Sequence, residues 1–482
     1  MNVKQKIKEQ ITANLKSIKG IVSITFVGSF VNQKDLSGIS DIDTVVVCKK
    51  LDRSTFQSCM NNLKTIDLKL IGLKDHQLKI NSTFGPLKFD KKNLVVIHLM
   101  IYDYELHKAH VLKSPFTCFS WEKGETWYGQ RIRNIYPVGS LQLKDFFEAR
   151  RSLKNYFDDL SKNQISYREY NFSKKKVSEI KKFFQMDNRH QGEFSYHLAY
   201  HLISNYLNFY LKKNKYYSPK KITIEIKRLF INNGTKHSKK FKQISQVKTQ
   251  RDSPFPRDCI GWSKNFISDF QKSIIFEWQN SSKVIFMRHF QTKLNDGSFL
   301  GQGRDPGISD NNFNPKISSE FDFVYCSSML RCKETAKILF PKNSLLEDNR
   351  LLEINYGKAE GLSYNQFKKK FPDIISAWNQ QKDPSFPNGE NMRNVKMRLN
   401  NFLYDLKLKL TDSKDKKNTF IITHNGILRC LIGQFFNLNE SIWHKINIPH
   451  AKNFEFLFWR GEFYPNLSRV TLANILKNIV LF

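Results

Sequence analysis

Three short apolar runs in the C-terminal part of the chain each end abruptly at polar residues. The runs are residues 283–287 (KVIFM), 321–326 (FDFVYC) and 419–423 (TFIIT), and the polar residues beyond them are Arg288 with His289, Ser327 with Ser328 and Arg331, and His424. Helical patterns lie between the runs, and this alternation predicts an α/β domain with a parallel sheet. Ligands of such sheets bind beyond the carboxyl ends of the strands, so we expect these polar side chains to converge on one site.

The side chains that would gather there suit a phosphoryl group. Arginines such as Arg288 and Arg331 donate paired hydrogen bonds to phosphate oxygens. A histidine such as His289 or His424 can attack phosphorus as a covalent nucleophile. An arginine and a histidine side by side at the end of a buried strand therefore indicate a phosphate site.

Motifs in this region resemble those of the histidine phosphatase superfamily, the phosphoglycerate mutase-like group. The opening signature of that family, R-H-G-[EQ]-[ST] followed by an Asn, is matched by Arg288, His289, Gln291, Thr292 and Asn295, with Phe290 in place of the usual glycine. The resemblance continues through FLGQGRDPGIS, CSSMLRCKETA, LLEINYGKAEG, FPNGENMRNVKMR and THNGILR. It spans nearly all of residues 283–482 and implies a three-layer α/β/α phosphoglycerate mutase-like domain.

The resemblance also implies a role for each matching residue. His289 would accept the phosphoryl group, and Glu353, in LLEINYG, would give a proton to the leaving oxygen. The residues that would hold the phosphoryl oxygens are Arg288, Arg331 and His424, with Asn295, Gln291 and Thr292 nearby as substrate-binding residues. Because the arginines and histidines supply positive charge, no metal or other cofactor is expected for this domain.

Two further residues of the region have less defined roles. Glu390, in NGEN, is either structural or in contact with substrate, and its position in the sequence does not decide between the two. His450, in IPHAKNF, is interpreted as a loop or core histidine rather than a member of the site.

A second polar constellation lies near the N-terminus, in FVGSFVNQKDLSGISDIDTVVV, residues 26–47. A strand ends at Gly28-Ser29, and a loop leads to Asp41 and Asp43, which strand alternation places on one face. Two carboxylates on one face can hold Mg²⁺ ions that bridge nucleotide phosphates. The Gly-Ser turn can present backbone N–H groups and a hydroxyl to the same phosphates.

This arrangement resembles the polymerase-beta type nucleotidyltransferase superfamily over roughly residues 20–105. The resemblance implies Asp41 and Asp43 as metal ligands, Gly28 and Ser29 as substrate-binding residues, and Mg²⁺ and a nucleoside triphosphate as cofactor and partner. The family normally adds a third carboxylate from a later strand. In NLVVIHLMIYD the candidates for that position are His98 and Asp103.

The chain is predicted to form three domains in an α/β multidomain protein. Residues 1–125 form an α+β nucleotidyltransferase-like domain, and residues 281–482 form the histidine phosphatase domain. Between them, residues 126–280 are predicted to be a mainly helical connecting or substrate domain, because the sequence there takes a helical period, most clearly in FSYHLAYHLISNYLNFYLKK.

Composition narrows the class of protein. Lys and Arg number 78 against 44 Asp and Glu, a net charge of +34 that favours anionic partners. The excess of basic residues is spread over every segment without an aromatic RNA-binding signature, so a nucleic-acid partner is not expected.

Seven cysteines, odd in number and without a C-x-x-C pair, argue against disulfides and zinc and for a reducing compartment. The N-terminus has no apolar leader and no run is long enough to span a membrane, so a cytoplasmic protein is expected.

Three functions are compatible with the sequence. The first is a bifunctional enzyme that hydrolyses phosphomonoesters through a phosphohistidine in its C-terminal domain and, with Mg²⁺, transfers a nucleotide to a small molecule in its N-terminal domain. The second is a metal-independent phosphatase whose N-terminal part is a non-catalytic nucleotide-binding or regulatory module. The third is a basic RNA-binding protein. The residue that lies beside Asp41 and Asp43 on the third strand separates the first two.

Overall fold

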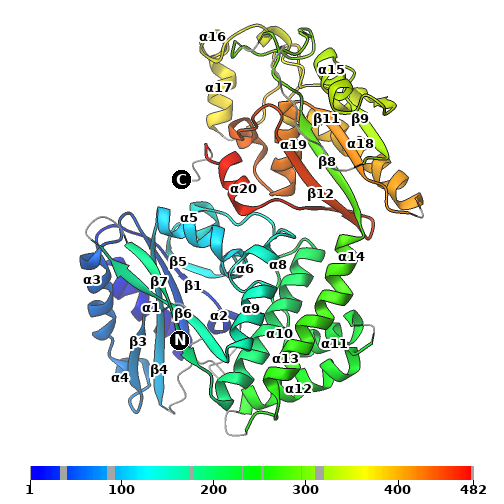
Figure 1. Ribbon diagram of the computed structural model, residues 1–482. Coiled ribbons are helices and arrows are strands. Elements are labelled where there is room, and N and C mark those ends of the chain that lie inside the picture. The colour runs from blue at the N-terminus through cyan, green and yellow to red at the C-terminus, as the bar shows by residue number, and fades with distance from the viewer. Residues whose placement is uncertain are drawn as a thin grey trace. The chain divides into compact units, whose positions relative to one another are not determined.

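A computed structural model of the chain describes residues 2–32, 41–83, 93–173, 177–230, 232–250, 254–294, 296–309, 320–380, 382–413 and 415–478. The chain divides into two compact units. Among the described residues, one unit comprises those up to Leu141 together with Asp145–Ile275, and the other comprises Gln142–Lys144 with those from Phe276 onward. In Figure 1 the first unit runs from blue to green and the second from green to red.

The first unit contains a five-stranded sheet with the order β3-β4-β2-β1-β5 (Figure 1). Its strands are β1 (Ile21–Phe26), β2 (Ile42–Cys48), β3 (Gln77–Asn81), β4 (Leu94–Asp103) and β5 (Glu125–Gly129). β1 runs antiparallel to β2 and β5, whereas β4 runs parallel to β2 and β3. Val and Ile dominate the central strands, as expected for side chains that pack well on a pleated surface.

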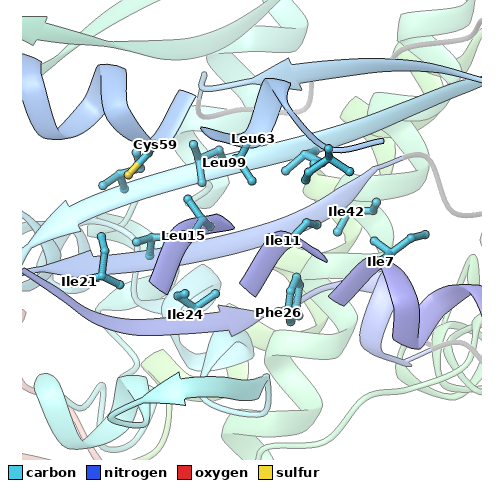
Figure 2. Close-up of a cluster of buried hydrophobic side chains, with 14 of the residues drawn as sticks. Ile7, Ile11, Leu15, Ile21, Ile24, Phe26, Ile42, Cys59, Leu63 and Leu99 are labelled. Atoms are coloured by element: carbon cyan, nitrogen blue, oxygen red, sulfur yellow. The ribbon is translucent and has the colours of Figure 1, made fainter. Parts of the chain in front are cut away.

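Helices cover one face of this sheet. Ile7, Ile11 and Leu15 recur every four residues on α1 (Val3–Lys16) and therefore share one side of the helix. Figure 2 shows them packed among side chains of α3 (Arg53–Lys64) and of the strands, namely Cys59, Leu63, Ile21, Ile24, Phe26, Ile42 and Leu99. Since neighbouring residues of a strand point to opposite faces, burial of Ile42 and Leu99 here directs Asp43 and His98 to the other face.

The rest of the first unit is mostly helical. Its other helices are α2 (Ser29–Asn32), α4 (Leu68–Ile71), α5 (Tyr104–Lys113), α6 (Pro115–Trp121), α7 (Ile132–Ile135), α8 (Asp145–Glu148), α9 (Leu153–Ser161), α10 (Asn188–Tyr210), α11 (Pro219–Leu229), α12 (Gly234–Gln250) and α13 (Cys259–Phe270). An antiparallel hairpin of β6 (Gln164–Phe172) and β7 (Val177–Gln185) interrupts them. The helical interpretation of residues 126–280 missed this hairpin, because its strands are half-exposed on both faces and show no apolar alternation.

The second unit contains a six-stranded sheet with the order β10-β9-β11-β8-β12-β13. The strands are β8 (Ser282–Arg288), β9 (Phe323–Cys326), β10 (Leu345–Glu347), β11 (Thr419–Thr423), β12 (Asn453–Trp459) and β13 (Glu462–Pro465). The first four in the spatial order run parallel, and β12 and β13 add an antiparallel edge. The three apolar runs identified in the sequence are the neighbouring strands β9, β11 and β8, which confirms the α/β prediction for this region.

Helices cover both faces of the second sheet. The helices are α14 (Phe276–Gln279), α15 (Leu330–Leu339), α16 (Tyr364–Lys370), α17 (Pro372–Asn379), α18 (Met392–Asp412), α19 (Asn425–Phe435) and α20 (Arg469–Ile475). On one face Cys332 and Ala336 of α15 pack with Met287 and Phe420. On the other face α18 packs Phe402 against Tyr325, at 5.3 Å between ring centroids, and α19 contacts β8. The result is a three-layer α/β/α arrangement.

Two predictions from composition can be compared with the structure. All seven cysteines are buried free thiols, as expected for a chain without a disulfide framework. Within the described ranges, no helix has the length and apolar content needed to cross a membrane.

Candidate active site

The ends of two neighbouring parallel strands bring His289 and His424 together. Arg288, the last residue of β8, is paired with Thr423, the last residue of β11, so each histidine is the next residue beyond its strand. The His289 N–H donates to the Thr423 carbonyl at 3.0 Å, which continues the pairing by one step. The two imidazole rings lie with their centroids 5.2 Å apart and both are buried.

A backbone hydrogen bond defines the chemical state of His289. Its Nδ1 lies 2.6 Å from the Phe290 carbonyl oxygen, and because a carbonyl only accepts, Nδ1 carries the hydrogen. Burial, with the positive charges of Arg288 and Arg331, holds the pKa of His289 well below its usual range. The ring is therefore neutral at neutral pH, with the lone pair on Nε2.

Phe290, which replaces the usual glycine, points into the core. Its side chain is 5% exposed and packs in a cluster with Met287 and Cys332, while its N–H donates to the Thr335 hydroxyl at 3.0 Å. Only its carbonyl takes part in the site, and every residue type supplies a carbonyl. The substitution therefore leaves the hydrogen bond to His289 intact.

His424 is held between a hydroxyl and a guanidinium. Arg331 Nε donates to His424 Nδ1 at 3.2 Å, so that nitrogen is the acceptor and Nε2 donates to the Ser327 hydroxyl at 2.8 Å. Burial and the charge of Arg331 hold the pKa of His424 well below its usual range. The remaining guanidinium hydrogen bonds of Arg331 go to the carbonyls of Gly301 and Arg304 and to Asp305 Oδ1, at 3.0–3.1 Å.

Two buried polar atoms in the segment from Arg288 to Thr292 have no hydrogen-bond partner among the described residues. Arg288 donates through Nη1 to the Ile448 carbonyl at 2.6 Å, but its Nε has no hydrogen-bond partner among the described residues. The hydroxyl of Thr292, a residue 2% exposed, is also without one. Burial lowers the pKa of Arg288 to about 10, so it remains a cation at neutral pH. Since buried donors are normally satisfied, this arrangement suits a bound anion.

Glu353 lies at the start of α19 on the same edge of the sheet. Its Oε1 accepts hydrogen bonds from the Gly426 and Ile354 N–H groups at 2.8 and 2.9 Å, and the side chain is buried. A Cβ atom at position 426 would lie 2.4 Å from that oxygen. The glycine of the H-N-G motif is therefore required for the close approach of the carboxyl group.

A brace that the sequence did not reveal holds the segment carrying Glu353. Arg398, on α18, donates to the carbonyls of Arg350, Leu352 and Glu353 at 2.6–3.0 Å and forms two hydrogen bonds with Glu390. Glu390 also accepts from the Asn355 N–H at 2.9 Å. Of the two roles left open for Glu390, these contacts support the structural one.

The other predicted residues of this region occupy different places. Gln291 is exposed, and its carbonyl accepts from the Ser309 N–H at 2.8 Å; Asn295 lies outside the described residues. His450, interpreted as a loop or core histidine, lies against the site, with its ring centroid 5.2 Å from that of His289. Its Nδ1 is 3.3 Å from the His289 carbonyl, and burial, with the charge of Arg288, lowers its pKa to about 4.

In the first unit, Asp41 and Asp43 lie together with His98. One ligand atom from each lies within 4.8 Å of the others. Gly28 approaches so closely that a Cβ atom there would lie 2.3 Å from Asp43 Oδ2, and its φ of +73° also favours glycine. Ser29 follows as the first residue of the short helix α2.

The strand register decides between the two candidates for the third position. Asp43 is paired with His98 across β2 and β4, whereas Asp103 is paired with Cys48 at the other end and caps α5 by accepting from the Leu106 N–H. His98 Nδ1 lies 2.8 Å from Asp43 Oδ1, and its Nε2 lies 2.5 Å from the Thr83 carbonyl. Burial alone would lower the pKa of His98, but Asp43 and Asp41 raise it above its usual value.

Comparison with known proteins concerns the second unit. The family model described as "Histidine phosphatase superfamily (branch 1)" matches residues 284–469. A fructose-2,6-bisphosphatase of Saccharomyces cerevisiae is 30% identical over 126 residues, which are 26% of this chain and 26% of that protein. The fructose-2,6-bisphosphatase TIGAR of Xenopus tropicalis is 28% identical over 177 residues, 33% of this chain and 62% of the relative. The chain thus spans less than two thirds of either relative.

A solved structure also matches. A phosphoserine phosphatase of Entamoeba histolytica in complex with phosphoserine aligns at 19% identity and a TM-score of 0.33, covering 39% of this chain and 98% of that one.

Acidification should destabilise the second unit. The folded pKa values of His289 and His424 lie well below 6.5, and burial, with the charge of Arg429, lowers that of His444 to about 4. Below about pH 6.5 the unfolded chain therefore binds more protons, and stability present above that pH is lost as the pH falls. Hydrogen exchange of β8 and β11 peptides, corrected for intrinsic rates, should show protection decreasing from about pH 7 to pH 5. Protection that stays constant or rises as the pH falls would contradict this expectation. The His444→Gln variant should show a weaker pH dependence of protection than the wild type.

Proposed function

We propose that the second unit, in which residues 284–469 belong to the histidine phosphatase superfamily, hydrolyses phosphomonoesters through a phosphohistidine formed on His289. The hydrogen bond from His289 Nδ1 to the Phe290 carbonyl carries this proposal. It assigns the hydrogen to Nδ1 and leaves Nε2 free to attack. Burial favours the neutral ring, which is the nucleophilic form.

The first step forms a bond between His289 Nε2 and phosphorus as the ester P–O bond breaks. The departing oxygen takes the electron pair of that bond and receives a proton from Glu353, so the alcohol leaves neutral. Arg288, whose Nε is buried without a partner among the described residues, provides positive charge for the phosphoryl oxygens, and Arg331 and His424 border the same site.

The second step releases phosphate. Water attacks phosphorus, the N–P bond breaks, and its electron pair returns to Nε2. Glu353, now ionised, accepts a proton from the water. The enzyme then has its neutral histidine and protonated acid again. The backbone hydrogen bonds from Gly426 and Ile354, together with the Arg398 brace, support this double role because they fix the position of the carboxyl group.

The substrate is proposed to be a phosphorylated small molecule. The matched relatives carry the names of fructose-2,6-bisphosphatases. These names support a phosphate ester of a small metabolite as the substrate. Sugar phosphates are the first group to test.

Replacement of the nucleophile and of the acid should have different effects. His289→Ala should abolish turnover, whereas Glu353→Gln should slow alkyl phosphates by about 10²–10⁴-fold and aryl phosphates far less, because a good leaving group needs no acid. Rapid quench with an activated aryl phosphate should trap the phosphoenzyme in Glu353→Gln. A His289→Ala variant with wild-type turnover would end the proposal.

Hydrolysis should persist in EDTA. The cationic groups at the site, Arg288 and Arg331, come from the protein itself, so removal of divalent ions should leave the rate of the full chain within about twofold. The rate of phosphate release is measured before and after chelation. Loss of activity that is restored by a divalent ion would contradict a metal-independent mechanism.

A second function concerns the first unit, which we propose binds a nucleoside triphosphate with a divalent cation. The juxtaposition of Asp41 and Asp43 and the close approach of Gly28 to Asp43 support this proposal. His98 stands where the nucleotidyltransferase resemblance would require a third carboxylate. This substitution favours a nucleotide-binding module over an enzyme that transfers nucleotides.

Asp43→Asn should weaken binding of a non-hydrolysable nucleoside triphosphate by at least about tenfold, because one carboxylate charge is lost from the cation site. Calorimetry in a His289→Ala background, which removes phosphatase turnover, measures the affinity. Equal nucleotide affinity in the His289→Ala variant with and without Asp43→Asn would contradict the assignment of Asp43 to the cation site. Incorporation of label from an α-labelled triphosphate into small molecules would instead establish transfer.

A further inference from the structure

The nucleotidyltransferase resemblance implies Mg²⁺, and this cation does not match the side chains of Asp41, Asp43 and His98. Within the described part of the chain, they are the one group of three His, Cys, Asp or Glu residues whose candidate ligand atoms all lie within 4.8 Å. Mg²⁺ takes oxygen ligands in near-octahedral geometry and usually keeps several waters. Here one of the three side chains is an imidazole, which suits Mn²⁺, Fe²⁺, Co²⁺ or Zn²⁺ better than Mg²⁺.

The orientation of the imidazole ring is that of a metal ligand. Thr83 offers its carbonyl to His98 Nε2 at 2.5 Å, so Nε2 carries a hydrogen, and Nδ1 faces the carboxylates, where it donates to Asp43 Oδ1 at 2.8 Å until an ion takes the place of that hydrogen. A backbone carbonyl on the second ring nitrogen is one of the usual outer partners of a ligating histidine. The carbonyl is itself positioned, because Thr83 is bound through its N–H and hydroxyl to Asn81 Oδ1, and Asn81 is paired with His98 across β3 and β4.

The spacing of the ligand atoms suits one ion. Two atoms bound to the same ion at about 2.1 Å lie about 3.0–3.4 Å apart at octahedral or tetrahedral angles. His98 Nδ1 lies 2.8 Å from Asp43 Oδ1 and 3.9 Å from Asp41 Oδ2, on either side of that range. Small side-chain rotations would therefore suffice. An ion that binds Nδ1 displaces the hydrogen that Nδ1 donates to Asp43, and the two carboxylates and the then neutral imidazole sum to a charge that matches a divalent cation.

We propose that Asp41, Asp43 and His98 bind one divalent cation of the nitrogen-tolerant kind, with Mn²⁺ preferred over Mg²⁺. The proposal rests on the cation site of the nucleotide-binding function proposed above, but the preference follows from the three side chains and needs no nucleotide. Gly28 contributes by leaving room beside Asp43, where a Cβ atom would lie 2.3 Å from Oδ2.

The test measures Mn²⁺ binding to the metal-free full chain without nucleotide, from the electron paramagnetic resonance signal of the free ion. We expect the wild type to bind Mn²⁺ at least about tenfold more tightly than competing Mg²⁺. His98→Ala should lose at least about tenfold in Mn²⁺ affinity, and His98→Asp should bring the two ions close to equal affinity. Pulsed spectroscopy should detect ¹⁴N coupled to bound Mn²⁺ in the wild type and not in His98→Ala.

His190→Ala, a histidine variant on α10 of the same unit, is the matched control and should bind Mn²⁺ as the wild type does. Circular dichroism and thermal unfolding of the full chain check that each variant is folded. Displacement of Mn²⁺ by an equal concentration of Mg²⁺, or unchanged Mn²⁺ affinity in His98→Ala, would overturn the proposed preference. Absence of any Mn²⁺ binding would overturn it too, whereas nucleotide binding, measured separately by calorimetry, tests the broader function.

Discussion

The parallel pairing of β8 with β11 is the constraint on which the carboxyl end of the second sheet depends. It sets Arg288 beside Thr423, and the next residue of each strand is a histidine of the site. Because strand side chains alternate between faces, a slip of one residue would reverse every side chain beyond it and separate the two rings. The buried residues on both faces, such as Ile421 and Ile422, prevent such a slip by requiring the native register. Core packing and site geometry are therefore fixed by the same interaction.

The sequence revealed those parts of the site that follow directly from strand ends. Arg288, His289 and His424 could be placed together because apolar runs mark the strands and polar residues end them. His450 and Arg398 could not be placed in this way. Their contacts join segments more than forty residues apart in the chain and depend on how a loop and a helix pack. No local pattern distinguishes such residues from ordinary loop or helix residues.

The first unit shows the same limit for strand register. His98 and Asp103 lie on one strand, and the sequence offered both as neighbours of the two aspartates. The choice depends on the register of β4 against β2. Loop length and core packing determine that register, and the residues of the strand itself do not. The hairpin of β6 and β7 was missed for a different reason. Its half-exposed strands carry aromatic and charged residues on both faces, so neither a strand period nor a helical period stands out.

The brace formed by Arg398 and Glu390 shows that the proposed chemistry depends on residues that do not themselves take part in it. Arg398 lies on the long helix α18 and donates a hydrogen bond to the backbone of the segment that carries Glu353. A survey of random substitutions scored by turnover would therefore mark Arg398 as strongly as a residue that meets the substrate. In relatives of this protein, we expect the arginine and its glutamate to change together or not at all, since either alone would leave a charge without its partner.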